Sequence, residues 1–284
     1  MTDDLRGHVA LITGATDGIG RLTASRLSAR RATVLVHGRS RDKVDAVVAE
    51  IEGKGGKARG LVADLAAAGR VRALAGEVLE ATPQLDILIN NAGVGDPGGP
   101  RRESDDGYEL HFAVNTLAPV VLTRLLAGRL AERAPDTYQD TSQDKGGARV
   151  VMVASAAQAE IDFDNLMLTR GYDGKRAYAQ SKLALIMATM ELAEELKSQG
   201  VTVNALHPGT LLNTKMVRQG FGSALGPADA GAEAEEHLAT APMLADITGA
   251  YFDRMDQAEP EVQAGDGEAR RRLMALIDQL AEAV

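Results

Sequence analysis

The sequence alternates between short apolar runs and longer amphipathic, alanine-rich stretches, and this alternation limits the possible folds most strongly. Continuous apolar runs are typical of strands that are buried on both faces of a parallel sheet. Such runs occupy residues 8–13, 33–36, 58–63, 86–90, 148–154, 201–206 and 247–252. Helical periodicity fills residues 18–30, 40–53, 67–81, 104–131 and 175–199. The pattern predicts a single α/β domain over residues 1–284, built on a doubly wound parallel sheet of seven strands.

Several stretches interrupt this alternation. Pro119 should bend or break the helix at 104–131, because proline lacks a backbone donor. Residues 132–147 are polar and predict a solvated connection. Residues 209–246 are far longer than a usual connection and predict a lid over a substrate site. Residues 253–284 form a C-terminal extension, whose helical apolar face would pack on the core or contact a partner.

Composition excludes several classes of function. The chain has 31 Lys and Arg against 40 Asp and Glu, a net charge of −9, which disfavours binding to nucleic acid or to an anionic membrane. It has no Cys, which excludes disulfides and thiolate metal sites, and its five His residues show no ligand spacing. The sequence shows no run of 18 apolar residues and no signal-peptide pattern. We therefore expect a cytoplasmic protein without a metal and without a membrane span.

A glycine-rich turn follows the first predicted strand and opens the first predicted helix. Gly14 permits a tight turn, Gly18 lets the backbone approach a pyrophosphate, and Gly20 allows close packing, while the helix N-terminus attracts negative charge. This position between strand and helix favours dinucleotide binding over a merely structural turn. The predicted cofactor contacts in the turn are Gly14, Thr16, Asp17, Gly18, Ile19 and Gly20.

The end of the second predicted strand indicates which dinucleotide binds. Folds that bind NAD usually place an acid here, and its charge would repel a 2′-phosphate. This chain has Arg39 instead, whose guanidinium can pair with that phosphate through its fork of donors, with Ser40 and Arg41 beside it. NADP(H) is therefore the predicted cofactor, with a solvated side chain as the alternative for Arg39. His37 is interpreted as a passive neighbour of the adenine.

Four motifs follow one another along the chain. They are Gly14-x3-Gly18-x-Gly20, Asn90-Asn91-Ala92-Gly93, Ser155 and Tyr178-Ala-Gln-Ser181-Lys182. With these motifs in this order, the chain closely resembles the short-chain dehydrogenase/reductase family from about residue 7 to the tail. The resemblance implies a Rossmann fold and hydride transfer between a nicotinamide and a carbonyl or alcohol. One departure is Asp17, where phosphate-preferring relatives often carry a basic residue.

Within the family, the closer likeness is to the retinol-dehydrogenase-like group, which includes polyketide ketoreductases of the daunorubicin C-13 type. The spacing of 23 between Ser155 and Tyr178, the run at 177–184 and the strand at 249–252 suggest it. The extra residues around 162–174 are expected to form a flap near the substrate. The membrane anchor of the retinol enzymes has no counterpart in this sequence, which argues against retinoid as the substrate.

The resemblance implies a catalytic tetrad of Asn115, Ser155, Tyr178 and Lys182. Tyr178 would protonate the carbonyl oxygen as hydride arrives, and Ser155 would hydrogen-bond the same oxygen. Lys182, one helical turn after Tyr178, would lower the pKa of the phenol together with the oxidised nicotinamide and would bind the nicotinamide ribose. Asn115 would link Lys182 to solvent through water. Taken singly, each of the four could be an ordinary structural or surface residue.

The same resemblance implies further cofactor contacts. Asp64 would contact the adenine, and a helix N-cap is its compatible alternative. The Pro-Gly turn after the sixth strand would contact the carboxamide and the diphosphate, through either Thr210 or Thr214, while His207 is interpreted as a structural residue of that turn. Beyond the glycine-rich turn and residues 39–41, the predicted set is Asp64, Leu65, Asn91, Ala92, Gly93, Tyr178, Lys182, Pro208, Gly209, Thr210 and Leu211.

The sequence thus predicts an NADP(H)-dependent oxidoreductase that acts on a fairly apolar small molecule, most simply as a ketoreductase. Oxidation of a lipid or retinoid-like alcohol is one alternative, and a non-catalytic NADP(H)-sensing protein is another. The resemblance also suggests a homodimer or homotetramer through the helices at 104–131 and 175–199. The residues that could form an apolar cover, or simply pack the lid, are Met216, Phe221, Leu225, Met243 and Leu244.

Overall fold

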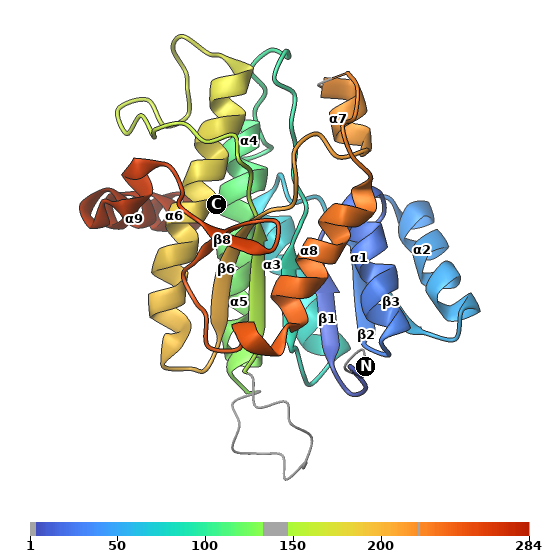
Figure 1. Ribbon diagram of the computed structural model, residues 1–284. Helices are drawn as coiled ribbons and strands as arrows, with labels where there is room; N and C mark the ends of the chain where they lie inside the picture. The colour runs from blue at the N-terminus through green and yellow to red at the C-terminus, as the bar shows by residue number, and fades with distance from the viewer. Residues whose placement is uncertain (1–3, 133–146, 221, 284) are drawn as a thin grey trace.

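The computed structural model describes residues 4–132, 147–220 and 222–283. Its centre is one sheet with the strand order β3-β2-β1-β4-β5-β6-β7-β8 (Figure 1). Strands β1 to β7 are parallel, and β8 pairs antiparallel with β7 at the edge. The strands are β1 (Val9–Ile12), β2 (Thr33–Gly38), β3 (Lys57–Val62), β4 (Ile87–Asn90), β5 (Arg149–Val153), β6 (Thr202–His207), β7 (Tyr251–Asp253) and β8 (Asp256–Ala258).

The seven parallel strands confirm the doubly wound sheet that the sequence predicts, and β8 is an addition that the sequence did not indicate. β8 has no apolar run because two of its three residues are exposed and polar. The seventh strand begins at Tyr251 rather than at residue 247, since Gly249 has a positive φ of 75° and turns the chain just before it. The sheet therefore has eight strands rather than the predicted seven, and its last pair, β7 and β8, is antiparallel.

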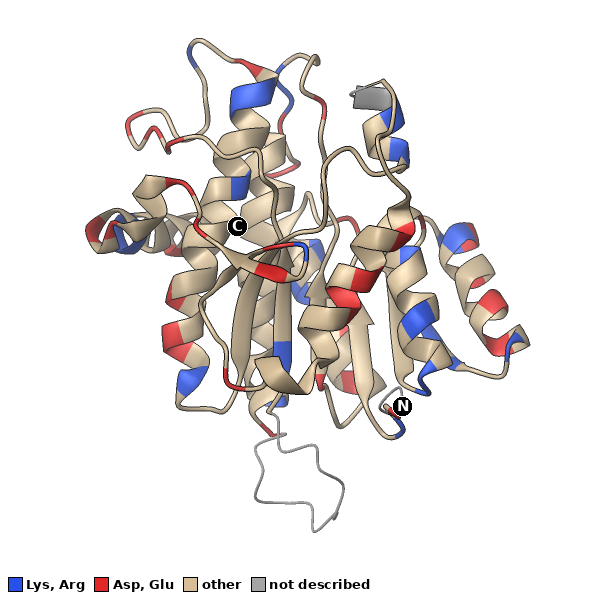
Figure 2. Cartoon of the chain, in the orientation of Figure 1, with Lys and Arg blue, Asp and Glu red and all other residues tan. Residues whose placement is uncertain are grey.

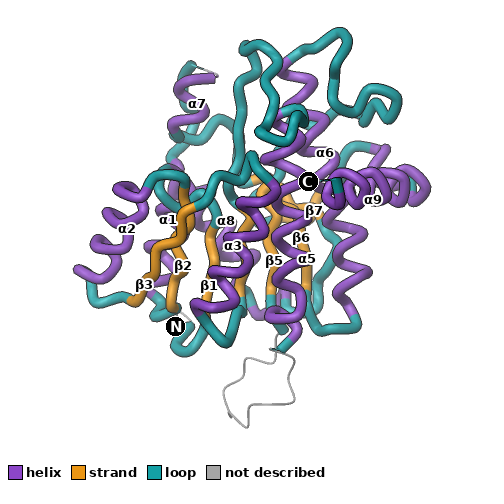
Figure 3. The backbone as a smooth tube through the Cα atoms, turned by 180° about the vertical axis from the view of Figure 1, so that it is seen from behind, coloured by secondary structure: helices purple, strands orange, loops and turns teal. Residues whose placement is uncertain are grey.

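Helices cover both faces of the sheet. One face carries α1 (Gly18–Ala29), α2 (Arg41–Gly53) and α8 (Ala228–Thr240), and the other carries α3 (Ala68–Ala81), α5 (Ala118–Ala131) and α6 (Gly174–Lys197) (Figures 1 and 3). Successive side chains of a strand point to opposite faces, so Leu11 packs in the core beneath α3 and α5 while Ile12 packs in the core beneath α1 and α2. This two-sided burial explains why the strands are unbroken apolar runs in the sequence.

The helix expected at 104–131 begins later, at Leu110, and runs without a break to Ala131, but its hydrogen-bonding pattern changes just before Pro119. It begins as α4 (Leu110–Phe112), passes through a π-helical turn, η1 (Ala113–Leu117), and continues as α5. In this turn the N–H of Ala118 donates to the carbonyl of Ala113, five residues back. Pro119 then lies in the first turn of α5, where its missing N–H costs least. Most of the connection predicted after α5 lies outside the described residues.

In the part of the chain that the structure describes, Leu110–Ala131 is the one helix that is long and apolar enough to cross a membrane. Within this protein, 78% of its apolar window is buried inside the fold. Its side chains belong to the core between the sheet, α3 and α6. The apolar character of this helix is therefore accounted for by packing.

The segment predicted as a lid, residues 209–246, divides into two parts. Its helix α7 (Lys215–Gly220) rises above the C-terminal edge of the sheet (Figure 1). Its second helix, α8, lies along α1, where Arg26 pairs with Glu236 at 2.6 Å and with Asp229 at 3.2 Å. Figure 2 shows the acidic side of α8 next to α1. Only the part before α8 therefore lies where it can cover the edge of the sheet.

The C-terminal extension ends in α9 (Gly267–Glu282), which packs on the outer side of α6. Leu273 and Ile277 of α9 are fully buried, and Arg270 pairs with Glu191 of α6 at 2.7 Å. Of the two alternatives that the sequence left open, the apolar face of this helix is used for core packing. The remaining short elements are the 3-10 turns η2 (Pro242–Leu244) and η3 (Val262–Gly265).

Candidate active site

The glycine-rich turn lies between β1 and α1, and the chain packs too closely at its glycine positions to admit a side chain there. Gly14 and Gly18 have positive φ values of 67° and 53°. A Cβ at Gly14 would lie 2.9 Å from the Cα of Ala92, and a Cβ at Gly20 would collide with the Asn91 amide. That amide donates to the carbonyl of Thr13 at 2.7 Å, so the Asn-Asn-Ala-Gly segment after β4 fixes the turn. The turn is therefore a backbone cradle at the N-terminus of α1, suited to a pyrophosphate.

His37 at the end of β2 supports the same turn from beneath. Its Nδ1 accepts from the N–H of Gly14 at 3.3 Å, and its Nε2 lies 3.1 Å from the carbonyl of Ala63. Burial lowers the pKa of His37 to about 4, so the ring is neutral and donates from Nε2. The interpretation of His37 as a passive neighbour of the adenine stays a prediction, and the structure adds that the ring is bonded to the glycine-rich turn.

The basic residues after β2 are exposed at the C-terminal edge of the sheet. The side chain of Arg39 is 70% exposed, and its Nη1 lies 3.8 Å from the Asp64 carboxylate after β3. Arg41 pairs with Asp45 one turn along α2 at 3.8 Å. Asp64 also accepts from the N–H of Ala66 at 3.0 Å in the turn before α3, whose N-cap is Ala67, so the alternative of Asp64 as a helix N-cap is wrong. An exposed guanidinium therefore lies at the strand end where sequence analysis expects a 2′-phosphate.

Three of the four predicted catalytic residues meet at the C-terminal ends of β5 and β6. Ser155 lies two residues after the end of β5, and Tyr178 and Lys182 lie one turn apart near the start of α6. The side chains of Ser155 and Tyr178 are hydrogen-bonded to each other. Lys182 donates to the carbonyl of Val153 at 2.7 Å, and its Nζ is 5.8 Å from the centroid of the Tyr178 ring. The structure thus places a phenol, a hydroxyl and an ammonium group around one point.

Burial determines the titration of these groups in the protein alone. It raises the pKa of Tyr178, and the hydrogen bond with Ser155 opposes this only in part. Burial also lowers the pKa of Lys182 to about 8. In the protein alone the pKa of the phenol is therefore raised rather than lowered, because desolvation outweighs the hydrogen bond with Ser155. The lowering expected from Lys182 together with the oxidised nicotinamide stays a prediction for the cofactor-bound protein. A phenol that keeps its proton at neutral pH is the form needed by a general acid.

Asn115 holds the loop after β4 through its side-chain amide. Its Oδ1 accepts from the N–H of Val94 at 2.9 Å, and its Nδ2 donates to the Val94 carbonyl and to Ser181 Oγ, both at 3.0 Å. Among the described residues no hydrogen bond joins Asn115 to Lys182. A Cβ at Gly93 would lie 3.2 Å from Asn115 and 3.6 Å from Lys182, so this glycine keeps space open between them.

The residues after β6 approach both the glycine-rich turn and Tyr178. Thr210 is bonded to His207 at 3.2 Å, whereas the side chain of Thr214 lies against Gly18. Of the two threonines that sequence analysis left open, Thr214 is the one at the cradle. Met216 of α7 reaches over the loop after β4, where a Cβ at Gly95 would lie 2.9 Å from its sulfur and 3.3 Å from Tyr178.

The other predicted cover residues behave differently from Met216. Leu225 and Met243 are 75% and 76% exposed, and Leu244 packs beside the core under α8. Phe221 lies outside the described residues. Among the predicted cover residues that the structure describes, Met216 is therefore the one that reaches the candidate catalytic centre. Within the described residues, no group of three or more acidic or His side chains could hold a metal ion.

A buried histidine beside Tyr178 and its acidic partner were not among the residues predicted from sequence. Glu109 and His111 are 2% and 3% exposed and bonded to each other at 2.8 Å. The His111 ring meets the Tyr178 ring edge-on, with centroids 6.2 Å apart and an interplanar angle of 85°. The signal that could have revealed them is the spacing of His111 and Asn115, which puts both on one helical face.

A family model described as short chain dehydrogenase matches residues 8–222, which is more than half of the chain. The protein belongs to the short-chain dehydrogenase/reductase family. As a member of this family it is an oxidoreductase that acts on a small molecule, and its fold is the family's nucleotide-binding fold. The motifs that suggested the resemblance are those that the structure brings to the C-terminal edge of the sheet.

Similar proteins include several retinol dehydrogenases. Human retinol dehydrogenase 13 is 38% identical over 291 aligned positions, which cover 95% of this chain and 83% of that protein. Bovine retinol dehydrogenase 12 is 36% identical and covers 95% of this chain and 84% of its own length. These relatives agree with the retinol-dehydrogenase-like group indicated by the Ser155–Tyr178 spacing.

Solved structures of the same fold support the assignment. An uncharacterized protein from Mycobacterium paratuberculosis matches this short-chain dehydrogenase with a TM-score of 0.76 and 28% identity, over 98% of this chain and 95% of that chain. A metagenomic short-chain oxidoreductase in complex with NADP has a TM-score of 0.63 and 28% identity, over 84% of this chain and 94% of that chain.

Proposed function

We propose that this short-chain dehydrogenase is an NADP(H)-dependent carbonyl reductase for fairly apolar ketones or aldehydes. The observation that carries the proposal is the hydrogen-bonded pair of Ser155 and a protonated Tyr178, with Lys182 buried beside it. All three lie at the edge of the sheet where the glycine-rich cradle opens. Proton donor, carbonyl anchor and cofactor cradle are therefore within one site.

The choice of NADP(H) rests on the residues around the cradle. Arg39 is exposed at the end of β2, and its fork of donors matches a 2′-phosphate. The acid Asp17, which seemed to oppose this choice, caps α1 by accepting from the N–H of Gly18 at 2.8 Å. The metagenomic relative is described with NADP, which supports the same choice by analogy.

The chemistry follows from how the three side chains share their protons. When bound, NADPH would supply the hydride that reaches the carbonyl carbon. Tyr178 would donate its proton to the carbonyl oxygen, while Ser155 would hold that oxygen by a hydrogen bond. Lys182, with a pKa lowered to about 8 by burial, would stabilise the phenolate left behind and help to return a proton to it.

The apolar substrate class rests on Met216, which lies over Gly95 next to Tyr178. A thioether at this position adapts to varied apolar surfaces. The similarity to retinol dehydrogenases 12 and 13 supports a second candidate, which is oxidation of a retinoid-like or lipid alcohol by the same residues in reverse. The predicted homodimer or homotetramer stays a proposal. Because α9 packs on α6 and its Asp278 pairs with Arg124 of α5, an interface formed by α5 and α6 would include α9.

The proposal is tested by NADPH consumption with nonanal and with acetophenone, and in reverse with retinol and NADP⁺. Tyr178→Phe should lower kcat by roughly 100-fold or more, because the general acid is lost, while NADPH affinity changes little. The matched control is Tyr108→Phe, which loses a hydroxyl bonded to the Leu280 carbonyl at 3.0 Å on the side of α9. Tight NADPH binding without turnover of any probe would favour a sensing protein instead.

A further inference from the structure

Glu109 and His111 form a buried hydrogen-bonded pair at the start of α4. One carboxylate oxygen of Glu109 accepts from the N–H of Phe112 at 2.8 Å and so caps the helix. The other accepts from Nδ1 of His111 at 2.8 Å. A carboxylate that only capped a helix would need neither this depth of burial nor a histidine partner, since exposed Asp or Ser residues serve as well.

The second ring nitrogen of His111 holds the loop after β4. Its Nε2 accepts from the N–H of Asp96 at 3.3 Å, so the ring donates from Nδ1 and accepts at Nε2. Asn115, one helical turn further on, binds the N–H and carbonyl of Val94 in the same loop. Two side chains on one helical face therefore fix the loop at two points, Val94 and Asp96. Between these points lies Gly95, which separates Met216 from Tyr178.

The same pair receives the flap, residues 162–174. The hydroxyl of Tyr172 donates to Glu109 at 3.4 Å, on the oxygen that also binds His111. Burial and the neighbouring Glu109 carboxylate raise the pKa of Tyr172 to about 12, so its hydroxyl stays a donor. Met167 of the flap accepts from the N–H of Glu109 at 3.4 Å. Glu109 is therefore bonded to the flap through both its backbone and its side chain.

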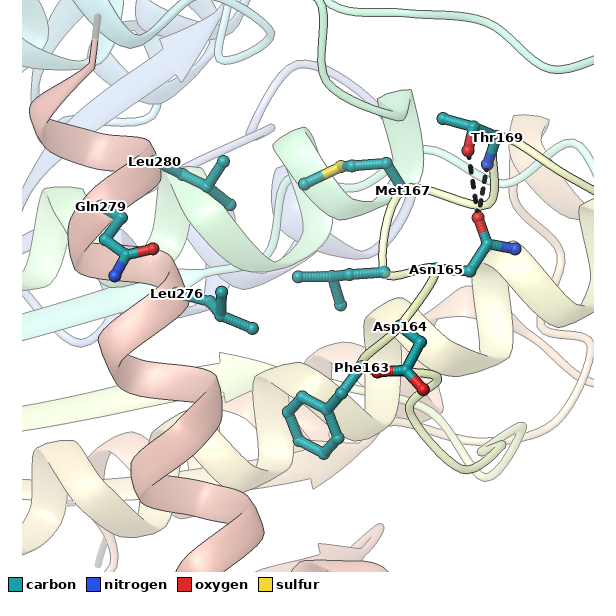
Figure 4. A pocket seen from close by; sticks show the side chains of 9 residues that line it. Phe163, Asp164, Asn165, Met167, Thr169, Leu276, Gln279 and Leu280 are labelled. Carbon is teal, nitrogen blue, oxygen red and sulfur yellow. Dashed lines mark hydrogen bonds between the residues drawn. The ribbon is translucent and has the colours of Figure 1, made fainter.

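The other side of the flap is packed less tightly. A cavity of about 300 Å³ separates flap residues from α9. Figure 4 shows Leu276 and Leu280 of α9 pointing across it toward Phe163 and Met167. Arg272 of α9 lies over the Phe163 ring at 4.6 Å and pairs with Asp164 at 3.4 Å, so α9 holds the first part of the flap. Glu109 holds the flap further along, through Met167 and Tyr172.

We propose that Glu109 and His111 are positioning residues that couple the flap and the loop Val94–Asp96 to Tyr178, and thereby align the substrate with its proton donor. The inference rests on the proposed carbonyl reduction. His111 lies against Tyr178 in an edge-to-face arrangement, holds the loop by Nε2 and holds Glu109 by Nδ1. Glu109 in turn anchors the flap, so a displacement of either segment is transmitted to the ring that faces Tyr178.

The kinetic test compares three variants with acetophenone and NADPH. Tyr172→Phe keeps the ring and loses the bond to Glu109, and we expect KM for acetophenone to rise by about three- to tenfold with kcat nearly unchanged. His111→Phe keeps a ring against Tyr178 but frees the loop and Glu109, and we expect kcat to fall by about tenfold or more while the Kd of NADPH stays within about twofold. Tyr108→Phe, which loses a comparable hydroxyl bond on the side of α9, should change neither parameter.

Hydrogen exchange of the protein alone gives a readout that does not depend on turnover. Tyr172→Phe and His111→Phe should each speed exchange in both segments, residues 94–97 and 162–174, whereas Tyr108→Phe should speed neither. Faster exchange in only one segment, or equal kinetic effects of Tyr172→Phe and Tyr108→Phe, would overturn the coupling. If the wild-type protein turns over no probe but both variants still speed exchange in the two segments, the proposed reaction is refuted and the positioning role stands.

Discussion

Asp17 and Arg39 carry opposite charges at the two sides of the predicted cofactor site, and their contacts assign them different tasks. Asp17 is bonded to the N–H of Gly18 and is explained by capping. Arg39 has one long contact, 3.8 Å to Asp64, and is otherwise open to solvent. An exposed pair at this distance contributes little to stability. Arg39 is therefore available for a ligand.

Replacing Arg39 should separate the two nicotinamide cofactors. Arg39→Ala is expected to raise the Kd of NADPH by about tenfold or more, since a charge-assisted bond to the phosphate is lost, and to leave the Kd of NADH nearly unchanged. Each Kd is measured by titrating the protein with NADPH or with NADH and following the fluorescence of the reduced nicotinamide. Lys43→Ala, which removes an exposed charge from the same helix, is the control. Equal losses for both cofactors would contradict the assignment.

Glu235 is a second residue whose burial has a measurable consequence. It is fully buried between α8 and α1, where its Oε2 lies 2.6 Å from Thr23 Oγ1. Its Oε1 has no hydrogen-bond partner among the described residues. Burial raises the pKa of Glu235 to about 8. A protonated Glu235 can donate to Thr23, whose hydroxyl donates to the carbonyl of Ile19 in the first turn of α1.

This raised pKa predicts that stability falls as the pH rises. From the ordinary pKa of 4.5 up to about 8, the unfolded chain loses this proton before the folded protein does. The free energy of unfolding should therefore decrease through this window, by at most about 1.4 kcal/mol per pH unit, and level off above it. Glu235→Gln should flatten that slope in urea unfolding at pH 5 and pH 8. Glu233→Gln, at an exposed position of α8, should keep the wild-type slope.

At the scale of elements, helix packing explains what hydrophobic periodicity alone left open. The apolar face of α9 could have served a partner, but it packs on α6, and Arg270 adds an ion pair with Glu191. Arg270 also donates to the carbonyl of Ala264 at 2.8 Å, which ties α9 to η3. The π-helical turn before Pro119 similarly decides the direction of Asn115, which the sequence could only place on a helix.

The bridge from α9 to α6 predicts a measurable stability difference between two neighbouring arginines. Arg270→Ala should lower the free energy of unfolding by roughly 1–2 kcal/mol, because a half-buried carboxylate and a carbonyl lose their donor. Arg271→Ala, at an exposed position one residue on, should stay within about 0.5 kcal/mol of the wild type. Urea denaturation of both variants measures this, and equal losses would show that α9 is held by its apolar face alone.

At the scale of the whole molecule, the parallel sheet gathers residues that are distant in sequence. Each strand of β1 to β6 ends at the same edge, so the glycine-rich turn, Arg39, the loop after β4 and Ser155 lie along one line. Insertions can rise above this edge without disturbing either core. The flap, α7 and the residues before α8 all do so (Figure 1). This arrangement explains why the additions to the sheet are found where a substrate would bind.

The sequence by itself determined the parallel sheet, the cradle and the identity of the candidate tetrad. Buried strands need unbroken apolar runs, tight turns need glycine, and a helix puts Tyr178 and Lys182 on one face, so each of these is a local requirement that residue order satisfies. Contacts between distant segments leave no local pattern. Only the tertiary structure decided that His37 supports the cradle, that Thr214 rather than Thr210 lies against Gly18, and that Glu109 and His111 join the flap to Tyr178.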